Sequence, residues 1–90
     1  MGGYKVLYTV KAQSDLSSLD KKIAIKILDK IDFFVATGQP LQYSKKLVNF
    51  EFGSYRFRIG NYRAIFDIDD KGSIAILVIL KIGHRKEIYL

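Results

Sequence analysis

GSYRFRIGNYRAIFDID, residues Gly53–Asp69, consists of two segments of alternating side chains joined by Gly60-Asn61. Gly-Asn between such segments is typical of a two-residue β-hairpin turn, because glycine tolerates the positive φ that the turn requires. If Gly60-Asn61 is the whole loop, Arg58 lies directly opposite Arg63. The stretch therefore predicts two antiparallel strands in a fixed register, around which the rest of the chain is arranged.

Because side chains alternate between the faces of a strand, this register divides the hairpin into two faces. One face is apolar and carries Tyr55, Phe57, Ile59, Tyr62, Ala64, Phe66 and Ile68. The other carries Arg56, Arg58 and Arg63, followed by Ile65, Asp67 and Asp69. Like charges opposite each other destabilise a sheet, and a bound anion would relieve the repulsion. Guanidinium groups match phosphate geometry, so this face is a candidate phosphodiester site. The alternative is a solvated outer face that keeps the edge of the sheet soluble.

The composition favours a polyanionic partner. The 90 residues suffice for one small domain, 1–90, and carry 15 basic and 9 acidic side chains, a net charge of +6. Such a charge suits nucleic acid or an acidic protein segment. The four arginines, Arg56, Arg58, Arg63 and Arg85, all lie in the C-terminal half, whereas residues 1–52 use only lysine.

Several classes of protein are excluded by what the sequence lacks. There is no cysteine and only one histidine, which argues against a disulfide scaffold and against a zinc site, so we expect neither metal nor cofactor. No apolar stretch is long enough to span a bilayer, and no signal peptide is visible. These features fit a protein of the cytoplasm that does not contact a membrane.

The N-terminal half predicts one strand and two helices. Tyr4–Val10 alternates and is rich in β-formers, and Ala12–Leu19 has the pattern of a short helix. Asp20–Thr37 is a long helix with Asp20 as its N-cap, ended by Gly38 and Pro40. Its apolar face consists of Ala24, Ile27, Leu28, Ile31, Phe34 and Val35, while Ile25 and Phe33 fall partly outside it.

The C-terminal half completes an α+β fold. Pro40–Phe52 is expected to be a connection that contains the basic pair Lys45 and Lys46, and Asp69–Gly72 a second turn. Ser73–Ile82 is nearly all apolar, which predicts a strand in the interior of the sheet. The order β-α-α-β-β-β, with short hairpin connections, predicts two N-terminal helices packed on a twisted, mostly antiparallel sheet of about four strands.

The closing peptide GHRKEIYL, Gly83–Leu90, follows this strand directly. If the strand lies beside the hairpin, His84, Arg85 and Tyr89 can reach the arginines. Fixed cations, an imidazole and a phenol fit RNA cleavage by the 2′-hydroxyl, which needs charge stabilisation at phosphorus and proton transfer to and from oxygen. We expect catalytic roles for Arg63, Arg85, Tyr89 and His84, and RNA or phosphate binding by Arg56, Arg58, Lys45, Lys46 and Lys86. No metal is required.

The sequence resembles the RelE/ParE superfamily of toxins from bacterial and archaeal toxin–antitoxin systems. The similarity lies in the hairpin GSYRFRIGNYRAIFDID, in GHRKEIY after an apolar strand, and in the opening YKVLYTVKAQSDLSSL before a long helix. It implies a compact RelE-like domain and, for the RelE branch, a ribosome-dependent mRNA endonuclease. On motif match, Arg56, Arg58 and Arg63 take the positions of the family's phosphate-contacting basic residues, Arg85 that of the tail arginine, and Tyr89 that of the C-terminal tyrosine.

The resemblance also implies partners and leaves alternatives open. It predicts a cognate antitoxin bound in a hetero-oligomer, besides mRNA and the ribosome with its rRNA. Arginine does not deprotonate readily, so the general base is open among His84, Tyr89, Glu51 and Glu87. The main alternative is a ParE-like inhibitor of DNA gyrase without nuclease activity. A third is an inactive module that only binds antitoxin.

Overall fold

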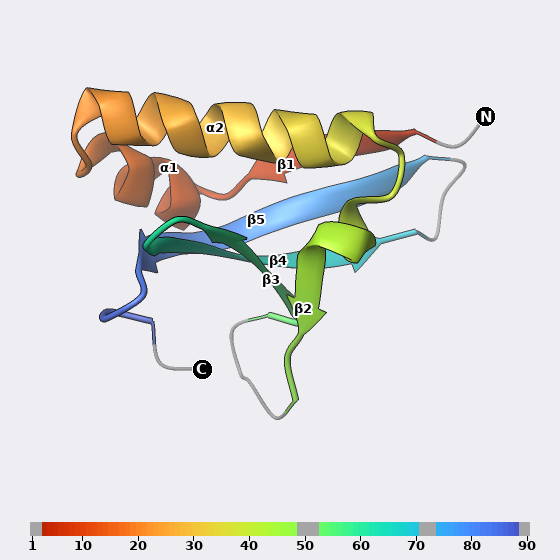
Figure 1. Cartoon of the computed structure of the whole chain (residues 1–90). Coiled ribbons are helices and arrows are strands. Elements are labelled where there is room, and N and C mark those ends of the chain that lie inside the picture. Colours follow the sequence, from red (N-terminus) through yellow and green to blue (C-terminus); the bar gives the residue numbers. More distant parts are fainter. Residues whose placement is uncertain (1–2, 49–52, 71–73, 89–90) are drawn as a thin grey trace.

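The computed structural model describes residues 3–48, 53–70 and 74–88. Two helices, α1 (Val10–Ser17) and α2 (Lys21–Ala36), cover one face of a five-stranded sheet (Figure 1). The sheet has the order β1-β5-β4-β3-β2, in which β1 runs parallel to β5 and the other neighbours are antiparallel. The strands are β1 (Tyr4–Tyr8), β2 (Ser44–Lys46), β3 (Tyr55–Ile59), β4 (Tyr62–Asp69) and β5 (Ala75–His84), and a 3₁₀ turn (Pro40–Tyr43) precedes β2.

The predicted hairpin is confirmed in its register. β3 and β4 pair Arg58 with Arg63, and the turn places Gly60 at φ 59°. The predicted apolar face forms the core with the helices: Phe57, Ala64 and Phe66 are fully buried there. The sheet therefore has one face against the helices and a second face, away from them, that carries the arginines.

Helix α2 packs through the stripe that its sequence predicts. The side chain of Asp20 accepts a hydrogen bond from the backbone of Lys22 at 3.3 Å, and Gly38 adopts φ 77° just beyond the helix. Ile27, Ile31 and Phe34 are buried against the sheet, where the Phe34 ring lies 4.8 Å from that of Phe57. Contact between aromatic rings stabilises the core beyond what the burial of their apolar area contributes.

The start of α1 differs from the prediction. Val10 was expected to end the first strand, but β1 ends at Tyr8 and Thr9 is the N-cap of α1. The hydroxyl of Thr9 accepts from Ala12 N at 3.1 Å and donates to Leu80 O at 3.1 Å. This cap outweighs the β-propensity of Val10, whose side chain is left 83% exposed.

Beyond the end of β1, the edge of β5 is bound by α1 instead of by another strand. The last pair between the two strands is Tyr8 with Ile79. Further along, the carboxylate of Asp15 accepts from the backbone N–H of Ile82 at 2.9 Å and binds the ammonium of Lys11. The backbone donor of a strand edge is thus satisfied by a helix side chain.

The sheet has five strands where about four were expected. Lys45 and Lys46 lie in β2, which pairs with β3, and not in a connection. The strand predicted at Ser73–Ile82 is confirmed as interior, between β1 and β4, but it continues through His84. Part of the turn predicted at Asp69–Gly72 lies outside the described residues.

Candidate phosphate-binding face

The second face of the sheet brings basic side chains into two rows across the strands. One row pairs Arg58 with Arg63, and Arg63 with Gly83. The other row joins residues of four strands: Lys45, Arg56, Ile65 and Lys81. Residues paired across neighbouring strands point to the same face. We call Arg56, Arg58 and Arg63, together with Arg85 from the C-terminal turn, the arginine cluster.

Arg63 lies at the centre of this cluster. Its side chain is only 7% exposed, and its Nη1 donates to the backbone oxygens of Gly60 and Tyr62 at 3.1 and 2.9 Å. Burial lowers the pKa of Arg63, and the charges of Arg56, Arg58 and Arg85 lower it further. Because this guanidinium is held by the turn and surrounded by like charges, it is positioned to bind an anion.

Arg56 provides an independent sign of a missing acceptor. Its Nε is buried and has no hydrogen-bond partner among the residues that the structure describes. A buried donor without a partner costs about 1–3 kcal/mol, and a bound phosphate oxygen would remove this cost. Among the described residues, the arginine cluster therefore combines repulsion between like charges with a buried donor that lacks a partner, and a bound phosphate would relieve both.

The C-terminal turn is tied to the hairpin. Arg85 N donates to Asn61 O at 2.8 Å, and Ile88 N donates to His84 O at 3.2 Å. Ile88 is 4% exposed and packs against Gly83, where an added Cβ would meet its side chain at 3.3 Å. Figure 1 shows this segment passing to the face of the sheet away from the helices. These contacts bring Arg85 to the cluster.

His84 lies elsewhere. It pairs with Tyr62, and the two rings meet edge to face with centroids 5.4 Å apart, on the helix-covered face. Its Nδ1 accepts the backbone N–H of Lys86 at 3.1 Å. The structure therefore does not bring the imidazole to the face of Arg63. Tyr89, expected in the site, and Glu51 lie outside the described residues.

The lysines expected to bind RNA divide between the two faces. Lys45 pairs with Arg56 and shares the second face. Lys46 pairs with Tyr55 and shares the face of the core aromatics. Lys86 is exposed in the C-terminal turn. The structure thus places Lys45, but not Lys46, on the face of the arginine cluster.

Lys81 was missed by the sequence analysis. Its pairing with Ile65 places it on the second face, in the same row as Arg56. It is the one charged residue within SIAILVILKI. That interruption of an otherwise apolar strand was the available signal.

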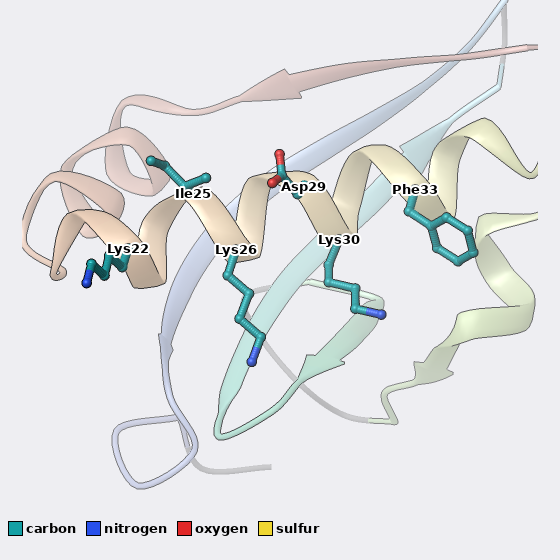
Figure 2. Close-up of a pocket in the computed structure, with 6 residues that line it drawn as sticks. All are labelled: Lys22, Ile25, Lys26, Asp29, Lys30 and Phe33. Carbon is teal, nitrogen blue, oxygen red and sulfur yellow. The ribbon is translucent and has the colours of Figure 1, made fainter.

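A separate surface lies on the outer side of α2 (Figure 2). A hollow of about 450 Å³ is lined by Lys22, Ile25, Lys26, Asp29, Lys30 and Phe33. The side chains of Ile25 and Phe33 are 48% and 53% exposed, and the ammonium of Lys30 lies 5.6 Å from the centroid of the Phe33 ring. Exposed apolar side chains beside lysines are typical of an interaction surface. No helix in the described part of the chain is long and apolar enough to cross a membrane.

Comparison with known proteins identifies the family. A family model described as the ParE toxin of the type II toxin–antitoxin system parDE matches residues 6–89. The chain belongs to the RelE/ParE superfamily of toxins. The toxin is 33% identical over 86 residues to Toxin RelG of Mycobacterium tuberculosis. The alignment covers 96% of this chain and 95% of RelG.

Solved structures agree with this assignment. The toxin superposes with a TM-score of 0.74 at 30% identity on a chain of the toxin–antitoxin complex RelBE2 from Mycobacterium tuberculosis, covering 92% of this chain and 99% of that one. A YoeB/ParE toxin from Agrobacterium tumefaciens has the same fold, with a TM-score of 0.66 at 20% identity over 89% of this chain and 97% of that one. The predicted family and the α+β fold are confirmed.

Proposed function

We propose that the toxin is an endoribonuclease that cleaves mRNA on the ribosome in the cytoplasm without a metal ion. The 2′-hydroxyl loses its proton and attacks the adjacent phosphorus, and the bond from phosphorus to the 5′-oxygen breaks as that oxygen takes up a proton. The observation that carries this proposal is Arg63, a nearly buried arginine held by the hairpin turn among three further arginines. A surface that only binds protein has no need for such a cluster, because like charges opposite each other cost stability.

Charge stabilisation is the part assigned to the arginine cluster. In-line displacement at phosphorus gathers negative charge on the equatorial oxygens, and preorganised donors lower the barrier because they need no rearrangement. Arg63 and Arg56 would bind these oxygens, while Arg58, Arg85 and Lys45 hold the neighbouring backbone. Lys46 and Lys86 would contribute to RNA binding from the rim.

His84 and Tyr89 are the two candidates for removing the proton of the 2′-hydroxyl or supplying one to the 5′-oxygen. The structure places the imidazole of His84 against Tyr62, so a proton route through His84 has to pass around the end of the sheet. Replacement of His84 therefore distinguishes between the two candidates.

The toxin is also proposed to form a hetero-oligomer with a cognate antitoxin. Support comes from its similarity to a chain of a toxin–antitoxin complex and from the hollow on α2. Three lysines beside Ile25 and Phe33 complement an acidic, amphipathic segment. Because α2 and the arginine cluster lie on opposite sides of the sheet, an antitoxin that blocks cleavage would need a second segment to reach the arginines.

Primer extension on a defined mRNA in translating ribosomes tests the nuclease. Wild type and Arg63→Ala are compared, with Lys21→Ala as a control that removes an exposed charge on α2. We expect cleavage by wild type and Lys21→Ala and a loss of about 10²- to 10³-fold in Arg63→Ala, the usual cost of one transition-state donor. Thermal melting establishes that Arg63→Ala is folded. Equal cleavage by all three proteins would refute the assignment of Arg63.

Inhibition of DNA gyrase is the second candidate. It is favoured by the family model, which describes a ParE toxin. A protein that inhibits gyrase supercoiling and leaves ribosome-bound mRNA intact would replace the nuclease proposal with this one.

A further inference from the structure

A β-bulge decides where Lys81 points. Phe66 pairs with Ile79, but Ile65 pairs with Lys81, so that Leu80 is an extra residue in β5. A bulge shifts the alternation of all side chains that follow it. Without it, Lys81 would share the helix-covered face with Ile79, which is fully buried. With it, Lys81 lies on the face of the arginine cluster.

A cleft of about 380 Å³ opens beside Lys81, at the edge of β5 that β1 leaves uncovered. It is lined by α1, by the end of β5 and by the C-terminal turn, through Lys11, Asp15, Ser18, Lys81, Gly83 and Glu87. Its volume falls in the range of ligand-binding pockets, ~300–1,000 Å³. Both ammonium and carboxylate groups line it, so that it offers hydrogen-bond donors and acceptors together.

The cleft lies beside β5, the strand that pairs with the arginine-bearing β4. Gly83 lines it and is also the residue directly opposite Arg63 in the neighbouring strand. Lys81 lines it and lies in the same cross-strand row as Arg56. Neighbouring strands are about 4.8 Å apart, so a ligand phosphate at Arg63 and a group in the cleft would be separated by about one strand.

We propose that this cleft binds the nucleotide next to the phosphate held at Arg63, with Lys81 contacting the phosphate of that nucleotide. The inference rests on the proposed nuclease function. Single-stranded RNA is recognised through unstacked bases and backbone phosphates, and the mixed lining of the cleft suits the donors and acceptors of a base edge. The bulge is the device that gives an otherwise apolar strand this contact.

The test measures binding of single-stranded RNAs in which the 2′-hydroxyl at the cleavage position is replaced by hydrogen. One RNA, the intact RNA, extends beyond the cleavage position in both directions. A second RNA stops at the nucleotide before the scissile phosphate, and a third begins at the nucleotide after it. Fluorescence anisotropy gives the Kd for wild type, Lys81→Met, Lys81→Arg and the control Lys21→Met, which makes the same charge change on α2. Thermal melting establishes that each variant is folded, and Lys81→Arg reports on the site if Lys81→Met does not fold.

We expect Lys81→Met to bind the intact RNA about tenfold more weakly, as for a lost hydrogen bond to a charged group, and Lys81→Arg to restore most of the affinity. The slope of log K against log salt should fall by about 0.7, the value for one phosphate of a single strand. One of the shortened RNAs should bind wild type as weakly as the intact RNA binds Lys81→Met. Lys81→Met should bind that shortened RNA no more weakly than it binds the intact RNA.

Two results would overturn the inference. One is that Lys81→Met binds the intact RNA as tightly as Lys21→Met does. The other is that Lys81→Met loses as much affinity as wild type with each of the two shortened RNAs. If wild type nevertheless cleaves mRNA on ribosomes, the nuclease function stands and only the cleft fails. If wild type neither binds nor cleaves RNA, both proposals fail together.

Discussion

Arg58→Gln removes one of the two guanidinium groups that face each other across the hairpin. We expect the variant to be more stable than wild type and to bind RNA more weakly. Arg58 is exposed and lies opposite the nearly buried Arg63. Burial lowers the pKa of Arg63 most, and the charges of Arg56, Arg58 and Arg85 lower it further, in keeping with the direct pairing of Arg58 with Arg63.

The size of the gain follows from Coulomb's law. Two unit charges ~7 Å apart repel by ~0.6 kcal/mol at the dielectric constant of water and by ~2.4 kcal/mol at an effective value of ~20. Because Arg58 is exposed and solvent screens it, the lower part of this range applies, ~0.5–1 kcal/mol in the free energy of unfolding. For a domain of this size the melting temperature should rise by about 2–8 °C.

Urea denaturation of wild type and Arg58→Gln at about 0.1 M and about 1 M salt measures this gain. The Debye length falls from about 10 Å to about 3 Å between these conditions, so the gain should largely vanish at high salt. Lys21→Gln makes the same charge change far from Arg63 and should show no comparable effect. A variant no more stable than wild type, or a gain that persists at about 1 M salt, would refute the idea that the hairpin stores repulsion for a bound anion.

Three further variants test other parts of the structure. Tyr8 has a buried hydroxyl without a partner in the described residues, and burial, then Asp32, raises its pKa from 10.0 to about 12. The unfolded chain therefore ionises first, and wild type should lose stability as the pH rises from about 10 to about 12. Tyr8→Phe should add about 1 kcal/mol in urea denaturation at about pH 7, and its advantage should widen at about pH 11; an unchanged difference would contradict this. Gly83→Ala would press a Cβ to 3.3 Å from Ile88, and we expect a loss of about 1–3 kcal/mol and slower mRNA cleavage, because the C-terminal turn must shift; unaltered melting and cleavage would argue against this. His84→Ala should slow cleavage less than tenfold, because the imidazole lies on the helix-covered face, whereas a loss of about 10²- to 10⁴-fold in primer extension would make His84 the general acid or base.

The hairpin could be predicted to the residue because its signals are local. The turn glycine fixes the loop length, and the loop length fixes which side chains share a face. Arg56, Arg58 and Arg63 were therefore placed together from the sequence alone. The long helix was equally accessible, since one apolar stripe and two end signals define it.

Features that depend on distant partners could not be predicted in the same way. The pairing of β2 with β3 makes a strand of Ser44–Lys46, three residues without any pattern of their own. The extension of β5 carries His84 into the ladder beside Tyr62, which turns its ring from the arginine cluster. The bulge at Leu80 leaves no mark in an apolar run, so simple alternation puts Lys81 on the wrong face.

The parallel pairing of β1 with β5 has a consequence for synthesis of the toxin. The hydrogen bond from Thr9 to Leu80 spans 71 positions of the chain, and that from Ile82 to Asp15 spans 67. Contacts between residues so far apart in the chain form late in folding, because the chain loses the entropy of closing the loop before the contacts can stabilise it. β1 therefore remains unpaired while the residues between it and β5 are synthesised. The arginine cluster is thus incomplete until β5 and the turn that carries Arg85 have been synthesised and the sheet has closed.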